Sequence, residues 1–183
     1  MRKNLLFSFL LTIAVLCSEQ LMAQEFKGLD KSPADVAWLP GNRKPAPIAK
    51  VVYSRPQLKG RALADLAPAG QLWRTGANET TEVTFIKDVT FAGTKVKAGT
   101  YALYTIPGSA KWTVILNSKL NTWGHYQYDA TQDVMKVEVT ARANSGAEVE
   151  AFTIQFADPA EGSSKSTMYL AWGSVIVDVP IEF

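Results

Sequence analysis

The sequence predicts an all-β fold, an antiparallel β-sandwich of jelly-roll-like type, with a closed β-barrel as the alternative. Three observations lead to this prediction. After the first 23 residues, no segment keeps an apolar period of 3.6 residues over ten residues, which argues against long helices. About nine or ten short segments instead mix alternating apolar positions with β-branched and aromatic residues. Turn-forming residues separate these segments at intervals of roughly ten residues.

The first 23 residues predict a cleavable signal peptide. Arg2 and Lys3 are basic, residues 5–16 are almost entirely apolar, and Ala23 is the small residue before the expected cleavage point. An apolar run of about a dozen residues is shorter than the ~20 needed to span a bilayer. We therefore expect export to the periplasm or cell surface, with no stable membrane insertion after cleavage. Cys17, the only cysteine, would be lost with the leader.

The remaining 160 residues (183 less 23) are enough for one domain. Frequent prolines and glycines predict an irregular N-terminal arm over residues 24–47, which Trp38 would hold against the domain. A single β domain is expected over residues 48–183. The whole chain carries a net charge of only +2, so no broad basic surface is expected and nucleic acid is not a predicted partner.

Within the domain, alternation and turn residues define the expected strands in chain order. These are residues 48–54, 82–87, 88–92, 101–106, 112–116, 135–139, 152–156, 168–172 and 175–183. Residues 55–69 contain two prolines and a glycine, and predict a loop with at most one helical turn.

A glycine-containing corner before the strand at 82–87 is the first candidate binding site. It carries Arg74, Asn78 and Glu79. The planar guanidinium of arginine donates two parallel hydrogen bonds to a carboxylate or phosphate, and asparagine can both donate and accept. A small polar ligand such as a carbohydrate would suit these side chains. The internal alternative, which the sequence favours, is that Arg74 satisfies carbonyl groups of its own loop and Asn78 adopts the turn conformation after Gly76.

Three further candidates, Trp123, His125 and Tyr126, lie in one short aromatic stretch. In a loop, such side chains can form a stacking surface for a sugar or a peptide. In a sandwich, they more often close one end of the core, and core closure is the expectation here.

Catalytic chemistry has little support in the residue types present. A single histidine and no cysteine after cleavage give no zinc-ligand set, so no metal site and no cofactor are expected. A hydrolase would use His125 as its base, oriented by Asp129 or Asp133, or a carboxylate pair of Glu79 and Glu82. On a strand, a spacing of three places these two glutamates on opposite faces, and only a bend near Thr80 would let them cooperate. We therefore favour a non-enzymatic role.

Four stretches together resemble a known family: residues 53–56 (YSRP), 72–79 (LWRTGANE), 98–108 and 112–117. Over residues 32–183 the chain is similar to a secreted bacterial family known as domain of unknown function 2911. The family has no established activity. The resemblance therefore implies an exported location and the extent of the domain, and it transfers no catalytic residue.

Three functional hypotheses follow from these observations. The first is an exported β domain that binds a small polar ligand such as carbohydrate. The second is a periplasmic hydrolase using His125 or the pair Glu79 and Glu82. The third is a structural component of an envelope assembly.

Overall fold

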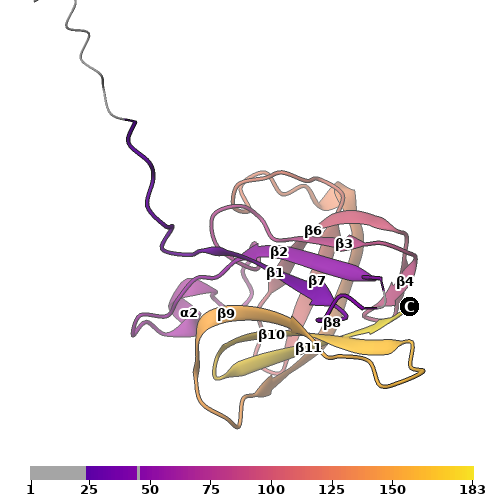
Figure 1. Cartoon of the computed structure of the whole chain (residues 1–183). Coiled ribbons are helices and arrows are strands. Elements are labelled where there is room, and N and C mark those ends of the chain that lie inside the picture. Colours follow the sequence, from indigo (N-terminus) through magenta and orange to yellow (C-terminus); the bar gives the residue numbers. More distant parts are fainter. Residues whose placement is uncertain (1–23, 45) are drawn as a thin grey trace, which may run out of the picture.

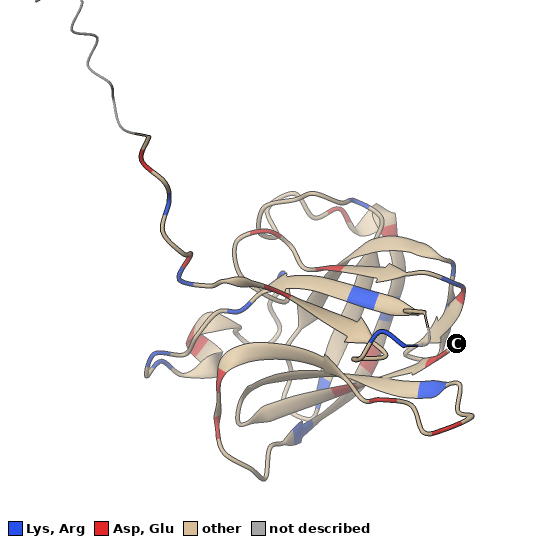
Figure 2. Ribbon diagram, in the orientation of Figure 1, with Lys and Arg blue, Asp and Glu red and all other residues tan. Residues whose placement is uncertain are grey.

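The structure is a computed structural model that describes residues 24–44 and 46–183. The predicted signal peptide lies outside the described residues. Residues 24–33 form no regular element and lead away from the folded domain (Figure 1). Lys and Arg are interspersed with Asp and Glu along the loops and strands (Figure 2).

Antiparallel strands form nearly all of the regular structure. They are β1 (Ala34–Leu39), β2 (Ala49–Ser54), β3 (Glu82–Phe85), β4 (Val89–Phe91), β5 (Thr94–Val96), β6 (Gly99–Ile106), β7 (Lys111–Asn117), β8 (Asp133–Ala143), β9 (Val149–Phe156), β10 (Lys165–Gly173) and β11 (Val175–Glu182). One helical turn, α2 (Leu63–Leu66), and one 3₁₀ turn (Ala130–Gln132) interrupt the loops. Within the described part of the chain, no helix is long and apolar enough to cross a membrane.

The strands form one sheet that bends round into a nearly closed barrel. Its order is β1-β2-β3-β6-β7-β8-β11-β10-β9, and the small β4–β5 hairpin pairs with the end of β11. The two ends of this path, β1 and β9, lie side by side. Side chains from β2 and the residue after it bond across to β9: the Tyr53 hydroxyl donates to the Ile154 carbonyl (3.3 Å), and Arg55 Nε donates to the Phe152 carbonyl (3.1 Å).

The predicted all-β antiparallel class is confirmed, and both the sandwich and the barrel descriptions fit this curved sheet. The last four strands of the order, β8-β11-β10-β9, form a Greek key, since three hairpin-connected strands return to pair with β8. The remaining neighbours follow the chain closely, as in a meander.

The N-terminal arm differs from the sequence expectation. Residues 34–39 form β1, which pairs along its whole length with β2, for example Val36 opposite Val52. Pro33 and Pro40 flank this strand and do not interrupt it, which leaves six consecutive residues able to pair. Leu39 at its end is completely buried. The first strand of the sheet therefore lies within residues 24–47, which were expected to be irregular because of their prolines.

The core inside the sheet contains a cluster of large aromatic rings. Trp73 stacks on Trp172 with ring centroids 5.4 Å apart, and it makes edge contacts with Phe152 (5.0 Å) and Trp112 (6.1 Å). Burial of this much apolar surface is the main stabilising contribution available to a domain. Trp73 directly precedes Arg74, so the core fixes the start of the candidate corner.

Candidate functional site

The corner that carries Arg74 is fixed to the sheet on both sides. Trp73 exchanges two backbone hydrogen bonds with Thr105 of β6 (2.8 and 2.9 Å). The Trp73 indole N–H donates to the carbonyl of Gly76 (3.1 Å). Thr75 is fully buried and adopts a left-handed backbone (φ 55°), which is unusual for a β-branched residue and is found where surrounding contacts enforce it. The corner is therefore held in a specific and strained shape.

Gly76 is required at this corner because other atoms approach its Cα closely. A Cβ placed there would lie 2.9 Å from Thr81 Oγ1 and 3.1 Å from the Ser54 carbonyl oxygen. The Thr81 hydroxyl cannot easily move away, because it donates to the carbonyl of Thr75 (2.7 Å). A residue with any side chain would push the corner outward.

The loop at residues 121–126 is joined to the corner by backbone contacts. Gly124 N–H donates to the Asn78 carbonyl (2.9 Å), and Thr80 N–H donates to the Thr122 carbonyl (2.9 Å). Asn78 itself has a left-handed backbone (φ 60°), a conformation that asparagine tolerates well. These contacts bring His125 next to a corner that is about 50 positions earlier in the chain.

A pocket of about 470 Å³ lies at this junction and holds three of the predicted site residues: Arg74, Asn78 and His125. Its full lining is Ser32, Pro56, Arg61, Leu66, Pro68, Gln71, Leu72, Trp73, Arg74, Gly76, Ala77, Asn78, His125 and Trp172. None of these lining residues is acidic, whereas two are arginines. A pocket with this lining has a positive potential that suits an anion.

Arg74 is the most unusual side chain of the pocket. Its Nε is buried and has no hydrogen-bond partner among the described residues, which also offer it no ion pair. A buried polar group without a partner is costly, and such groups in folded proteins call for an explanation. The sequence offered the alternative that Arg74 bonds to carbonyl groups of its own loop. In the described residues, the Arg74 side chain makes no such hydrogen bond.

Arg61 is the residue of this pocket that the sequence did not point to. Its Nε donates to the Leu58 carbonyl (2.9 Å) and its Nη2 to the Gln57 carbonyl (2.7 Å), which holds the guanidinium close to the loop backbone. The sequence gives no local signal that Arg61 lines this pocket, because Arg61 reaches the pocket only through folding of the loop around α2.

The N-terminal arm borders the same pocket. Ser32 lines it, and the Asp30 carboxylate accepts a hydrogen bond from the Asn78 side-chain amide (3.1 Å). The pKa of Asp30 lies below its ordinary value, chiefly because the Ser32 backbone N–H donates to the carboxylate and secondly because of the Asn78 amide. The chain thus places a carboxylate of its own on one of the pocket's donors.

The aromatic stretch does not close the core, contrary to the expectation. Trp123 is 58% exposed and Tyr126 is 76% exposed. The Tyr126 ring stacks on the His125 ring (centroids 5.1 Å apart, 29° between planes). Core closure falls instead to Tyr128, which packs on Tyr104 (5.0 Å). The closing ring thus comes from the far end of the loop, and the earlier aromatic rings remain at the surface.

Tyr128 is held by a short hydrogen bond from its hydroxyl to the Asp133 carboxylate (2.6 Å). Burial, followed by this bond to a carboxylate, raises the pKa of Tyr128 well above its usual value. The hydroxyl therefore stays protonated and keeps donating at any physiological pH.

Glu79 and Glu82 line a different pocket, of about 340 Å³, on the other side of the corner. They were expected on opposite faces of a strand. That expectation fails because β3 begins only at Glu82, while Glu79 forms an isolated bridge with Trp123. The Glu82 carboxylate accepts from the Asn121 backbone N–H (2.8 Å), so part of its hydrogen-bonding capacity is already used.

The arrangement proposed for a histidine-based hydrolase is not assembled in the described residues. Asp129 accepts from Thr131 N–H (3.0 Å), and Asp133 accepts from the Asn117 amide (2.8 Å) and from Tyr128, so each has other partners than His125. No hydrogen bond links His125 to a hydroxyl group in the described chain. Among the same residues, no three His, Cys, Asp or Glu side chains gather in a way that could hold a metal ion.

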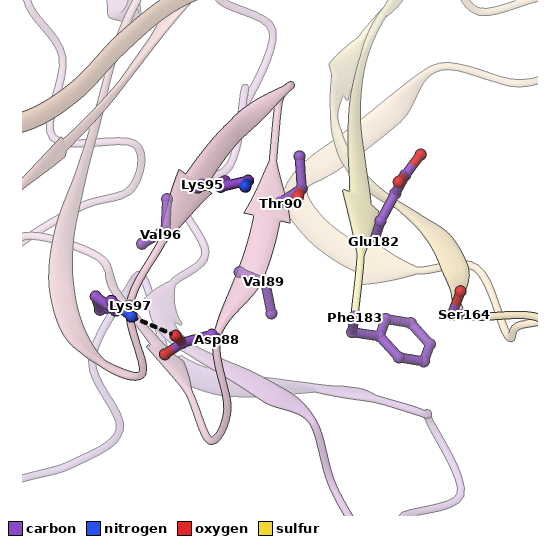
Figure 3. Close-up of a pocket in the computed structure, with 9 residues that line it drawn as sticks. All are labelled: Asp88, Val89, Thr90, Lys95, Val96, Lys97, Ser164, Glu182 and Phe183. Carbon is purple, nitrogen blue, oxygen red and sulfur yellow. Dashed lines mark hydrogen bonds and ion pairs between the residues drawn. The ribbon is translucent and has the colours of Figure 1, made fainter.

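A further pocket, of about 430 Å³, lies between the β4–β5 hairpin and the C-terminal end of β11 (Figure 3). It contains none of the predicted site residues. Its charges are largely paired within the protein, since Lys97 bonds Asp88 (2.8 Å) and Glu182 bonds Lys165 (2.9 Å). Such pairs lower the tendency of a side chain to bind an external ion, in contrast to Arg74.

Comparison with known proteins places the chain in a family. Neither the curated proteins nor the solved structures contain a match to this chain. A family model described as "Protein of unknown function (DUF2911)" matches residues 44–181, which run from just before β2 almost to the end of β11. The resemblance seen in the sequence motifs is thereby confirmed, and the chain belongs to the DUF2911 family.

Proposed function

We propose that this protein is a binding domain for a small polar ligand that carries an anionic group, held in the pocket of Arg74. The single observation that carries the proposal is the buried Arg74 Nε, which lacks a partner among the described residues and belongs to a pocket with no acidic lining residue. An incoming carboxylate or phosphate would supply acceptors for the guanidinium, and charge-assisted hydrogen bonds of this kind are among the strongest in proteins.

The surroundings of Arg74 favour an organic anion over a bare inorganic ion. Asn78 and Gln71 offer amide groups, Ser32 offers a hydroxyl, and Leu66 and Trp172 contribute apolar surface. Pockets that bind small molecules typically combine apolar walls with a few well-placed polar groups. A hydroxylated carboxylic acid or an acidic carbohydrate fits this combination.

The rigidity of the corner supports a binding role. Because the corner is fixed by the Trp73 contacts and by the strained Thr75, the position of Arg74 is set before a ligand arrives. A preorganised site loses less conformational entropy on binding than a flexible one. The proposed location, the periplasm or cell surface, rests on the leader sequence alone, and N-terminal sequencing of the secreted protein, expected to begin at Gln24, tests it.

The test is isothermal titration calorimetry with D-gluconate, a hydroxylated carboxylate. Arg74→Gln removes the charge and is expected to weaken gluconate binding by about ten- to a hundredfold, the equivalent of the ~1.5–3 kcal/mol of a hydrogen bond to a charged group. Arg142→Gln is the matched control, because Arg142 is partly exposed and paired with Asp178 on β11 (2.8 Å). It should leave affinity unchanged. No gluconate binding by the unaltered protein, or equal loss in both variants, contradicts the proposal.

A further inference from the structure

Resting on the proposed function, we propose further that the anion bound at Arg74 is the carboxylate of an acidic sugar, whose pyranose ring lies on the exposed ring of Tyr126. This assigns a ligand class to the pocket and a role to Tyr126, whose side chain does not itself line the pocket.

The cationic and the aromatic parts approach each other at Gly124. A Cβ placed on this glycine would lie 2.7 Å from Cε2 of Tyr126 and 3.7 Å from Nη1 of Arg74. The Tyr126 ring and the guanidinium end of Arg74 therefore both lie close to Gly124. The left-handed backbone of Gly124 (φ 67°), together with this crowding, makes glycine necessary there. A ligand held by Arg74 would extend over the Tyr126 ring.

The Tyr126 ring is presented to solvent in a defined way. One side stacks on His125, which lines the pocket, and the ring remains 76% exposed, so the opposite side is open. Trp123, 58% exposed, is bridged to Glu79, which lines the neighbouring pocket, so no role is assigned to it here. An exposed aromatic ring beside a pocket suits the apolar face of a sugar.

The combination of groups selects a sugar acid in preference to other anions. A pyranose ring has an apolar C–H face that packs on aromatic rings, and a rim of hydroxyl groups that need hydrogen-bond partners. The pocket offers such partners at Ser32 and Gln71, and at the Asn78 amide, whose nitrogen also donates to Asp30. A fully apolar acid would make no hydrogen bond to these polar groups.

The experiment compares three matched probes by calorimetry. Methyl β-D-glucuronide carries the ring and the carboxylate, D-gluconate carries the carboxylate without a ring, and methyl β-D-glucoside carries the ring without the carboxylate. We expect the glucuronide to bind at least about tenfold more tightly than gluconate, and the glucoside to bind more weakly than both. Tyr126→Ala should reduce this advantage while gluconate affinity stays within about twofold. Trp123→Ala and Ile86→Ala, at two other exposed large apolar side chains, should change neither affinity.

The outcomes separate the two proposals. If gluconate and the glucuronide bind equally, or if Tyr126→Ala leaves the glucuronide affinity unchanged, the acidic-sugar assignment is wrong while the anion site stands. If neither binds, both proposals fail. Equal loss of gluconate and glucuronide in Tyr126→Ala would also contradict the assignment, because it would show damage to the anion site in place of loss of a sugar contact.

Discussion

Replacing Trp73 by Phe tests whether the core holds the Arg74 corner in place. The indole N–H of Trp73 donates to the Gly76 carbonyl (3.1 Å), and phenylalanine keeps an aromatic ring but has no donor. Trp112 offers a matched control. It lies in the same cluster, is also buried (4% exposed), and its indole has no acceptor in the described part of the chain.

The expected loss in the free energy of unfolding follows from comparing the two variants. Both lose ring volume, which should cost ~1–2 kcal/mol, a fraction of the ~3–5 kcal/mol found for complete truncation of Trp or Phe. Only the Trp73→Phe variant also leaves the Gly76 carbonyl without its donor, at a further ~1–3 kcal/mol. The free energy of unfolding should therefore fall by about 2–5 kcal/mol for Trp73→Phe and by about 1–2 kcal/mol for Trp112→Phe.

The assay is urea unfolding followed by tryptophan fluorescence and far-UV circular dichroism, with thermal melts alongside. A difference of 1 kcal/mol should appear as a Tm difference of roughly 2–4 °C in a chain of this size. Gluconate affinity should also weaken in Trp73→Phe and remain unchanged in Trp112→Phe. Equal destabilisation by the two substitutions, or unchanged ligand affinity in Trp73→Phe, would refute the idea that this hydrogen bond fixes the corner.

Three other predictions concern the corner, its loop and the arm. Gly76→Ala should destabilise the fold by ~1–3 kcal/mol through collision with Thr81, and a melt within error of the parent would count against it. Tyr128→Phe should lower stability at pH 7 by ~1–2 kcal/mol. Because the pKa of Tyr128 is raised by folding, its contribution is complete below the ordinary value near 10 and is lost as pH rises above it. The variant should therefore lose less stability than the parent between about pH 9 and 11, as measured by urea titrations; identical pH profiles would be contrary to this. Asp30→Asn removes a negative charge beside the pocket, so calorimetry at low salt should show severalfold tighter gluconate binding, whereas weaker binding would mean that the arm assists the ligand.

Much of the fold could be predicted because alternation reports directly which face of a strand is buried. In the strand at 152–156, Phe152, Ile154 and Phe156 are all buried, as the pattern indicated. Strand β1 was missed because Pro33 and Pro40 flank it and made the segment look irregular. The six residues between these prolines are enough for a strand, but their number alone does not show that a strand forms. Whether it does form depends on β2 being free to pair, which is a long-range property.

The candidate site was predictable only in its local part. Arg74 and Asn78 share one corner, and a glycine in that corner was a visible sign of a constrained backbone. Glu79 was assigned to the same site, but the left-handed backbone at Asn78 turns the chain and places Glu79 in the neighbouring pocket. Arg61 gave no signal, because its position depends on packing between segments distant in sequence. Sequence periodicity contains no information about such contacts.

The most direct test of the central claim is the NMR signal of the Arg74 side chain. The Nε–H of Arg74 is buried and has no acceptor among the described residues, so its ¹⁵N–¹H resonance can be followed while D-gluconate is added. The account predicts a saturable shift of this resonance as the carboxylate binds the guanidinium, with the Nε–H signal of Arg142 unchanged. A resonance that stays in place while the protein binds gluconate would contradict the claim that Arg74 holds the anion.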